Sequence, residues 1–429
     1  MPSNKGRMGE VDYFRYDQYG DNPMPAMGPI GIIALDGARE FATQVNQHLV
    51  QRRCEYLHNV AEDEVEHETG FMRDNYIIDT KAVRFSSGEG KGVIQNTVRG
   101  HDLYILADIT NYSCTYKMRG VINHMSPDDH YQDLKRMILA ASGQARRINV
   151  IMPFLYESRQ HRRTARESLD CAYMLEELFN LGISSLITFD AHDERVSNSV
   201  PTHSFESIPS YYQIMKRLVR DVPDLRLDPQ HMMVVSPDEG AIQRSMYYAS
   251  MMGLPLGTFY KRRDYSRVEN GRNPIIAHEF LGDNVEGMDI LIVDDMISSG
   301  ESMLDLARIL KQKKANRIFC AATFGLFTDG TRLFDEAYEQ GLIDRVLTTN
   351  LIYTEDAVKQ SPWYSSADMT KFIALLIDAI NHNASMTSLF NPSRKIEKLM
   401  KRVRKEDVVE PGVASEQVLA SQVELDLEA

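Results

Sequence analysis

The stretch that decides the fold lies in the second half of the chain and reads Ile290-Leu291-Ile292-Val293-Asp294-Asp295-Met296-Ile297-Ser298-Ser299-Gly300-Glu301-Ser302. Four consecutive apolar residues are typical of a strand that is buried on both faces, and the small polar residues after the aspartates are typical of a turn. A helical pattern over residues 303–311 follows the turn. In open α/β sheets ligands bind at the carboxyl ends of the strands. The stretch therefore predicts both a fold class and the position of a ligand site.

The chemistry of this stretch indicates a site for a 5-phosphorylated ribose with Mg²⁺. Two adjacent carboxylates at a strand end suit a vicinal diol or a hydrated divalent cation. The free N–H groups and the dipole of a helix N-terminus suit a phosphate, with serine hydroxyls as further donors. A strand end that only caps its helix with serine explains the serines but not the paired acids. The residues expected to contact the sugar phosphate are Asp294, Asp295, Ser298, Ser299, Gly300 and Ser302.

The same alternation of strand and helix runs outward from this stretch. In the first half, apolar strands are predicted near residues 30–35, 103–106, 149–152 and 185–189, with helices at 38–50, 132–141 and 166–181. In the second half, strands are predicted at 232–235, 256–260, 290–293, 318–322 and 346–349. Strands that alternate with helices favour a parallel sheet with crossover helices. The expected class is α/β, with two tandem units of parallel sheet flanked by helices.

The chain is expected to divide into five parts. An irregular arm precedes the first unit, and a helix after the second unit returns to the core. The expected boundaries are 1–28 for the arm, 29–206 for the first unit, 207–355 for the second, 356–391 for the returning helix and 392–429 for a basic helix with an acidic tail.

Composition favours a globular protein of more than one domain. At 429 residues and 49.0 kDa the chain exceeds the usual size of a single core. Its net charge of −13 argues against a general role on nucleic acid, because a phosphate-tracking surface needs a basic excess. An anionic substrate therefore requires a local basic site.

Cysteine usage and the lack of long apolar runs predict a cytoplasmic protein. Cys54, Cys114, Cys171 and Cys320 lie far apart without a C-x-x-C pair, which fits a reducing compartment and structural thiols. The chain starts with polar residues, and its apolar runs are far shorter than the roughly 20 residues that a membrane span requires. No membrane partner is expected.

The C-terminal part changes sharply in charge. Arg394–Lys405 holds seven basic residues and one acid, whereas Glu406–Ala429 holds seven acids and no base. A solvated helix followed by a disordered acidic tail is one interpretation. Contact with an anion or with a partner is the other.

Six motifs along the chain resemble those of the ribose-phosphate pyrophosphokinase family, also called PRPP synthetases, which has the phosphoribosyltransferase-like fold. Ile290–Ser302 resembles the PRPP loop, Val235–Arg244 the S-P-D-x-G-G-x-x-R element, and Tyr260–Arg263 the start of the flexible catalytic loop. The D-L-H, R-Q and F-S-x-x-E elements are similar to Asp190-Ala191-His192, Arg159-Gln160 and Phe85-Ser86-Ser87-Gly88-Glu89. All six follow the order of the family, and the likeness spans residues 29–391.

The resemblance implies Mg²⁺-dependent transfer of diphosphate from ATP to the 1-hydroxyl of ribose 5-phosphate, giving PRPP and AMP. His192 and Asp238 are then the expected metal ligands, and Lys261 and Arg263 the catalytic cations. The expected ATP contacts are Phe85, Ser87, Glu89, Arg159, Gln160, Arg166 and His192. In the family the F-S-x-x-E element reaches the adenine of a neighbouring subunit, so a homo-oligomer built from dimers is expected, with a hexamer as one form.

Five positions depart from the family pattern. His161 stands where the family usually has Asp, Ser87 where it has Asp or Asn, and Ala241 where it has Gly. In the sugar-phosphate loop, Ser298 replaces Asp and Glu301 replaces Gly. Glu301 places a carboxylate beside the expected phosphate and must point away from it for binding.

Two other functions stay open. A non-catalytic, regulatory homologue is one, against which Lys261, Arg263, His192 and Asp238 argue. A phosphoribosyltransferase that uses PRPP as its substrate is the other. That class needs one such unit, whereas this chain has two.

Overall fold

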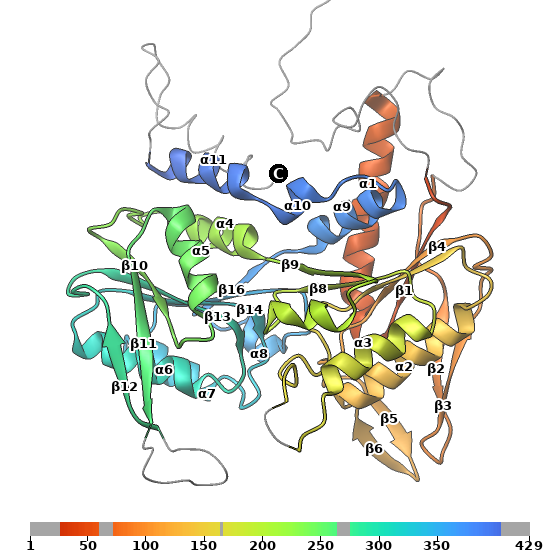
Figure 1. The fold of residues 1–429 in the computed structure, drawn as a ribbon, viewed down its shortest axis with the longest axis horizontal. Coiled ribbons are helices and arrows are strands. Elements are labelled where there is room, and N and C mark those ends of the chain that lie inside the picture. The colour runs from red at the N-terminus through yellow and green to blue at the C-terminus, as the bar shows by residue number, and fades with distance from the viewer. Residues whose placement is uncertain (1–25, 60–71, 164–165, 264–274, 405–429) are drawn as a thin grey trace, which may run out of the picture.

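The computed structural model describes residues 26–59, 72–163, 166–263 and 275–404. Two central sheets lie side by side with helices on their faces (Figure 1). Within the described residues, no helix is both long enough and apolar enough to cross a membrane. The predicted α/β class is confirmed.

The first sheet has five parallel strands in the order β1-β4-β7-β8-β9. Their bounds are β1 (Ile30–Ala34), β4 (Asp102–Leu106), β7 (Arg147–Ile151), β8 (Ser185–Phe189) and β9 (Ser204–Ile208). The helices of this unit are α1 (Arg39–Asn59), α2 (Pro127–Ala141) and α3 (Asp170–Asn180), with short 3-10 turns η2 (Asp36–Ala38) and η3 (Glu194–Ser199). Ser126 caps α2 by accepting from the N–H of Asp129, whose carboxylate accepts in return from the N–H of Ser126.

The second sheet has seven strands in the order β12-β11-β10-β13-β14-β15-β16. Their bounds are β10 (Met232–Ser236), β11 (Leu256–Arg263), β12 (Ile275–Leu281), β13 (Asp289–Ile297), β14 (Ile318–Gly325), β15 (Arg345–Thr349) and β16 (Tyr364–Ala367). The pairs are parallel except that β12 runs antiparallel to β11. The helices are α4 (Tyr211–Asp221), α5 (Ile242–Met252), α6 (Glu301–Gln312), α7 (Arg332–Glu339) and α8 (Asp356–Lys359).

Two hairpins extend the first unit. They are β2 (Thr80–Arg84) with β3 (Gly90–Ile94), and β5 (Thr115–Met118) with β6 (Val121–His124). The second hairpin supports the first, because the N–H of Arg119 donates to the carbonyl of Ser86 at 3.0 Å and the Arg84 guanidinium lies over the Tyr116 ring. Figure 1 shows β2 and β3 at the edge of the first unit that faces away from the second, and β5 and β6 below α2 and α3.

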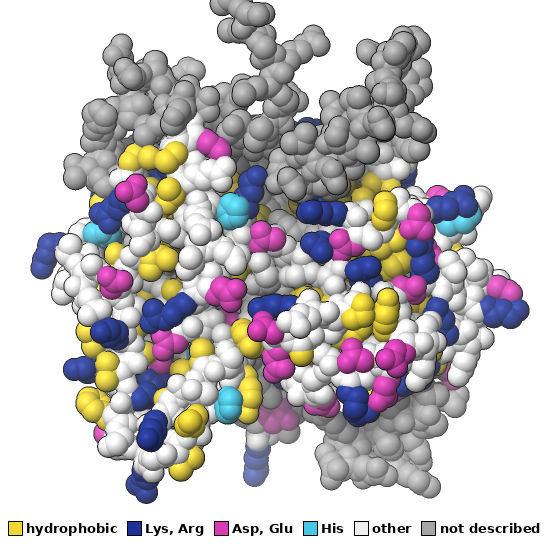
Figure 2. Space-filling view, turned by 180° about the vertical axis from the view of Figure 1, so that it is seen from behind, with side chains coloured by type: hydrophobic (Ala, Val, Ile, Leu, Met, Phe, Trp, Pro, Cys, Tyr) yellow, Lys and Arg dark blue, Asp and Glu magenta, His cyan; other side chains and the backbone are white. Residues whose placement is uncertain are grey.

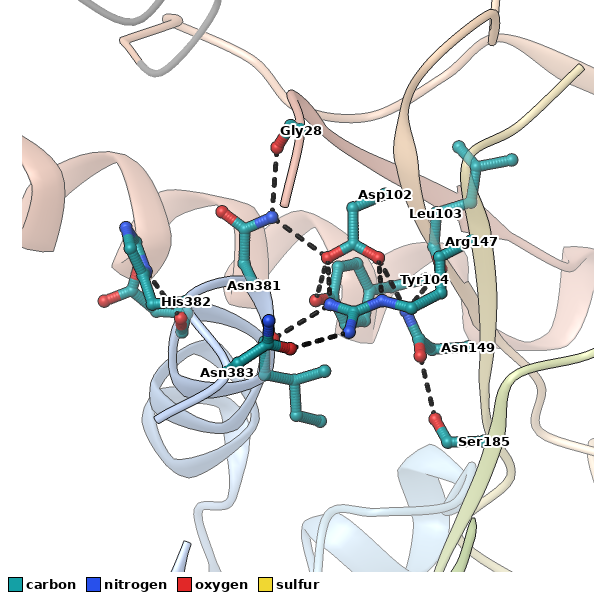
Figure 3. A network of polar contacts seen from close by, with 12 residues as sticks. Gly28, Asp102, Leu103, Tyr104, Arg147, Asn149, Ser185, Asn381, His382 and Asn383 are labelled. Carbon is teal, nitrogen blue, oxygen red and sulfur yellow. Dashed lines mark hydrogen bonds and ion pairs between the residues drawn. The ribbon is translucent and has the colours of Figure 1, made fainter. Parts of the chain in front are cut away.

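The C-terminal helices α9 (Thr370–Asn381), α10 (Thr387–Phe390) and α11 (Ser393–Arg404) lie together along one side of the molecule (Figure 1). α9 packs against α1 and adds Ile373, Leu376 and Ile377 to the core of the first unit, although it follows the second in sequence. A polar network fixes its end. As Figure 3 shows, Asp102 accepts from Arg147, from Tyr104 at 2.6 Å and from Asn381 at 2.9 Å. The network ties the end of α9 to the starts of β4 and β7.

Candidate active site

An ion pair joins the two units where the first sheet ends. Asp190 follows β8 with a positive φ of 40° and is 7% exposed. Its carboxylate accepts hydrogen bonds from Arg244 on α5, at 2.8 and 2.9 Å, and from the Thr323 hydroxyl on β14 at 2.6 Å. Because a charge this deeply buried is costly unless it is paired, the contact fixes one unit against the other.

Two residues further on, His192 reaches the paired acids of the second unit. Its Nδ1 donates to Asp295 Oδ2 at 2.7 Å. This hydrogen bond raises the pKa of His192 against the opposing effect of burial. Burial works to raise the pKa of Asp295, but the hydrogen bond from His192 and the charge of Arg244 outweigh it and hold that pKa below its usual value. Since Nδ1 is engaged, Nε2 is the ring nitrogen that is left to meet a metal ion.

Asp294 differs from its neighbour. It is partly exposed, and its Oδ1 accepts from the N–H of Asp295 at 2.9 Å. Burial of its carboxyl and then the charge of Asp295 raise the pKa of Asp294 well above its usual value. Two adjacent acids in this state need a proton or a cation between them. The donor set therefore fits a divalent ion or the hydroxyls of a sugar.

The turn after these acids needs its glycine. Gly300 has a φ of 87°, and a Cβ there would run into the Phe334 ring. Phe334 is itself fully buried and stacked on Trp363, so it has no room to give way. Ser298 and Ser299 are partly exposed, Ser302 and Glu301 are exposed, and α6 begins at Glu301. The serines therefore flank a helix N-terminus, as expected for a phosphate site.

The second predicted turn follows β10 on the neighbouring strand. Asp238 Oδ1 accepts from the N–H groups of Gly240 at 3.0 Å and Ala241 at 3.2 Å, and α5 begins directly afterwards. Ala241, which stands where the family has Gly, therefore still donates its N–H to Asp238 within the turn. Among the described residues, no group of three or more His, Cys, Asp and Glu side chains is placed to hold a metal ion. With His192 and Asp238 as the predicted protein ligands, a metal ion would need phosphate oxygens and water as its other ligands.

The predicted nucleotide residues fall into two groups. Arg159, Gln160 and Arg166 are exposed on the loop after β7, and the charge of Arg159 acts to lower the pKa of His192, which places it nearby. Phe85, Ser87 and Glu89 instead lie at the turn of the β2–β3 hairpin, where Phe85 is 49% exposed and the Ser87 hydroxyl donates to Glu89 at 2.7 Å. The hairpin lies at the far edge of the first unit (Figure 1), so the chain does not bring this second group to its own His192.

Lys261 and Arg263 lie at the end of β11, opposite His278 and Ile275 of β12, with a register shift between Arg262 and Arg263. Their side chains, and the residues 264–274 that follow, fall outside what the structure describes. Their catalytic roles stay predictions.

The sequence pointed to some residues without assigning them a role. Arg244 and Asp190 both stand inside quoted motifs, but only the fold shows that they form a buried pair across the two units. Thr323 carried no signal, because it lies one residue beyond the strand predicted at 318–322. His161, a departure from the family, lies with its ring centroid 5.5 Å from that of His192 and its Nε2 3.3 Å from Asp193 Oδ2.

Two α/β units, with acidic and glycine-containing turns at the carboxyl ends of β10 and β13, define a protein of the phosphoribosyltransferase-like class. The chain matches two family models: the N-terminal domain of ribose phosphate pyrophosphokinase over residues 30–182, and the phosphoribosyl synthetase-associated domain over residues 266–391. The chain belongs to the ribose-phosphate pyrophosphokinase family, whose name states its general activity.

Relatives support this assignment over most of their length. The ribose-phosphate pyrophosphokinase of Vibrio parahaemolyticus is 27% identical over 319 residues, which cover 73% of this chain and 91% of that protein. The enzyme of the same name from Mycoplasma genitalium is 28% identical over 325 residues, or 74% and 88% of the two chains. The crystal structure of phosphoribosylpyrophosphate synthetase from Mycobacterium smegmatis shares the fold, with a TM-score of 0.64 at 21% identity over 83% of this chain and all of that one.

Proposed function

We propose that the protein transfers diphosphate from ATP to the 1-hydroxyl of ribose 5-phosphate, giving PRPP and AMP, and that it requires Mg²⁺. The observation that carries the proposal is the 2.7 Å contact between His192 and Asp295. It joins a predicted ATP and metal ligand of the first unit to a predicted sugar ligand of the second. The proposal accordingly places the two substrates on either side of this contact.

In the proposed reaction the 1-hydroxyl oxygen attacks the β-phosphorus of ATP. The bond from that phosphorus to the α,β-bridging oxygen breaks, AMP leaves with the electron pair, and the hydroxyl proton passes to solvent. Asp294 orients the ribose hydroxyls, and the turn from Ser298 to Ser302 holds the 5-phosphate. Lys261 and Arg263 stabilise the charge that develops on the phosphate oxygens, a role worth on the order of a few kcal/mol per group.

The proposed metal ligands are His192 and Asp238. Mg²⁺ when bound neutralises phosphate oxygens and so lowers the repulsion that an anionic nucleophile meets. Asp295 fixes the His192 ring through Nδ1, so that Nε2 is presented in one orientation. The N-terminus of α5, which follows the Gly240 turn, suits the phosphates of the nucleotide.

The proposal includes a cytoplasmic homo-oligomer built from dimers, with a hexamer among its forms. Phe85, Ser87 and Glu89 support it, because they lie at the turn of the β2–β3 hairpin, which is at the edge of the first unit that faces away from the second, and so suit a neighbour's nucleotide. Nucleic acid is not a proposed partner. On the face in Figure 2, acidic and basic side chains are interspersed without a continuous basic surface.

The test is incubation of the purified protein with ATP, ribose 5-phosphate and Mg²⁺, followed by assay of AMP and PRPP. We expect both products, each dependent on both substrates. A Lys261→Ala variant should lose turnover by at least about a hundredfold while it still binds ribose 5-phosphate. Failure to form either product, across divalent ions and phosphate concentrations, contradicts the proposal and favours the non-catalytic homologue.

A further inference from the structure

His161 turns inward in a loop whose other side chains face solvent. It lies after β7, directly behind the predicted ATP contacts Arg159 and Gln160. These two residues, and Arg162 and Arg163 on the other side, are exposed, whereas the His161 side chain is only 14% exposed. The motifs assign His161 no role, since the family usually has Asp at this position.

The His161 side chain contacts two consecutive residues of the loop after β8. Its ring centroid lies 5.5 Å from that of His192, and the two ring planes are inclined by 57°. This separation is within the range of favourable aromatic pairs. Its Nε2 lies 3.3 Å from Asp193 Oδ2. One side chain therefore joins the loop of predicted ATP contacts to the loop that carries a predicted metal ligand.

Asp193 is a fixed anchor for this contact. It is the residue that caps η3, and its Oδ1 accepts from the N–H of Arg195 at 2.9 Å and from the Arg195 Nε at 2.9 Å. Its side chain is 13% exposed. Because η3 sets the position of the carboxylate, the contact with His161 ties the loop after β7 to a defined point of the fold.

The ring of His192 consequently has two supports. Asp295 accepts from its Nδ1 at 2.7 Å, and the ring of His161 lies beside it. The His192 side chain is 38% exposed, so general packing does not hold it. A single hydrogen bond fixes one ring nitrogen but lets the ring tilt about that contact. A second contact beside the ring restricts this tilt and keeps Nε2 in one direction.

We propose that His161 is a positioning residue, which holds the His192 ring in the orientation that meets the metal ion and its bound ATP. This inference rests on the proposed function, because that function makes His192 a metal ligand. His161 acts through His192 and not on the reacting atoms. Aspartate, which the family usually has at this position, offers no ring to His192, so this support belongs to the present chain.

Titration calorimetry of the full-length protein with Mg²⁺ and α,β-methylene-ATP measures the consequence for binding. His161→Ala removes both contacts and should weaken nucleotide binding about tenfold, as expected when a histidine ligand loses an orienting partner. His161→Phe keeps a ring beside His192 and should stay within about threefold of the wild type. Binding of ribose 5-phosphate should stay unchanged in both variants, which also shows that they fold.

A matched control removes a ring contact of another histidine. His203 packs on Phe179 with the ring centroids 4.4 Å apart. It precedes β9, which starts at Ser204 and runs parallel to β8. His203 therefore lies at the opposite end of the sheet from His192, and His203→Ala should leave the affinities for both ligands unchanged.

Nuclear magnetic resonance of the ligand-free protein, with ¹³C-labelled histidine, observes the His192 ring itself. The signal of His192 is assigned by its loss in His192→Gln. We expect a narrow His192 signal in the wild type and in His161→Phe. In His161→Ala the signal should be broadened by motion of the ring.

Three results overturn the inference. One is a His192 signal in His161→Ala that is as narrow as in the wild type. Another is equal nucleotide affinity in His161→Ala and His161→Phe. The third is an equal loss of nucleotide and ribose 5-phosphate binding in His161→Ala, which shows a general structural role. Failure of the wild type to bind the nucleotide contradicts the proposed function instead, and the ligand-free spectra then still decide whether His161 positions His192.

Discussion

Asp294 and Asp295 are neighbours in the chain but meet different surroundings. Asp295 is 4% exposed and accepts from His192, whereas Asp294 is partly exposed and has a pKa raised by burial and by its neighbour. Side chains of successive strand residues point to opposite faces, which is why two adjacent acids take two roles. We infer that Asp295 serves the His192 side and Asp294 the sugar side.

This division predicts different losses from the two alanine variants. Asp295→Ala removes the partner that orients His192, so the apparent affinity for Mg²⁺ with ATP should fall by about 10-fold to 100-fold. Asp294→Ala should weaken ribose 5-phosphate binding and leave that Mg²⁺ dependence within about twofold. Titration calorimetry with a non-hydrolysable ATP analogue measures the first effect and sugar-phosphate titration the second. Equal Mg²⁺ dependence in both variants contradicts the assignment of Asp295.

The elements that the sequence predicted well are the parallel, buried ones. β8 and β10 were expected within one residue of their observed bounds, whereas β13 runs four residues past its expected end, to Ile297, and so contains Asp294 and Asp295. α1 runs on to Asn59, past the expected end at residue 50, and α3 starts at Asp170, four residues after its expected start. The shift in α3 follows from Ser168, which bonds Asp170 and favours a turn before the helix.

The exposed and antiparallel elements escaped prediction. β3 and β6 have no buried residue, so they lack the apolar signal of the inner strands. β16 is parallel and largely buried, but it has only four residues and lies at one edge of its sheet, so its apolar signal is too short to stand out. The contacts between distant elements could not be predicted from the sequence either. Arg53 and Asp378, for example, are 325 residues apart, and no local pattern links them.

At the scale of two helices, α1 and α9 are locked by the buried Asp378. Asp378 is 1% exposed and accepts from Arg52 at 2.7 Å and Arg53 at 3.2 Å. Asp378→Asn leaves Arg53 buried with less compensation and should cost about 3 kcal/mol in urea unfolding. The control Asp305→Asn removes an exposed partner of Arg308 and should change stability by less than about 0.5 kcal/mol. Equal small effects contradict the locking role of this contact.

Asp378 also makes the folding stability depend on pH in the acidic range. Although burial works to raise the pKa of Asp378, Arg53 and Arg52 hold it at about 2, below the model-peptide value near 3.9. A lowered folded pKa means that the stabilisation is complete above about pH 4 and is lost as pH falls towards 2. It amounts to roughly 2 kcal/mol on that pH interval. Unfolding free energies of Asp378→Asn should therefore fall less steeply between pH 4 and 2 than those of the wild type.

At the scale of the whole molecule, the two units form a site where the Asp190–Arg244 pair and the His192–Asp295 contact cross between them. The hairpin with Phe85 and Glu89 lies outside this arrangement. The motifs gave the order of these parts along the chain. Only the fold shows which motifs come together within one chain and which lie apart, where a neighbouring subunit could use them.

Complementation tests whether the hairpin serves a neighbouring subunit. A Phe85→Ala variant with Glu89→Ala should lose most activity but keep an intact His192 site, and Lys261→Ala should keep an intact hairpin. Co-expression of the two, with separate affinity tags to isolate mixed oligomers, should restore a substantial fraction of the activity. Activity no greater than the sum of the two variants alone contradicts a shared site.

The most direct test of diphosphate transfer follows ATP labelled with ³²P at the β-phosphorus. With ribose 5-phosphate and Mg²⁺ present, the label should pass to PRPP while unlabelled AMP forms in equal amount. Label that stays in ATP, or that appears in ADP without any in PRPP, contradicts the function proposed for the His192–Asp295 site.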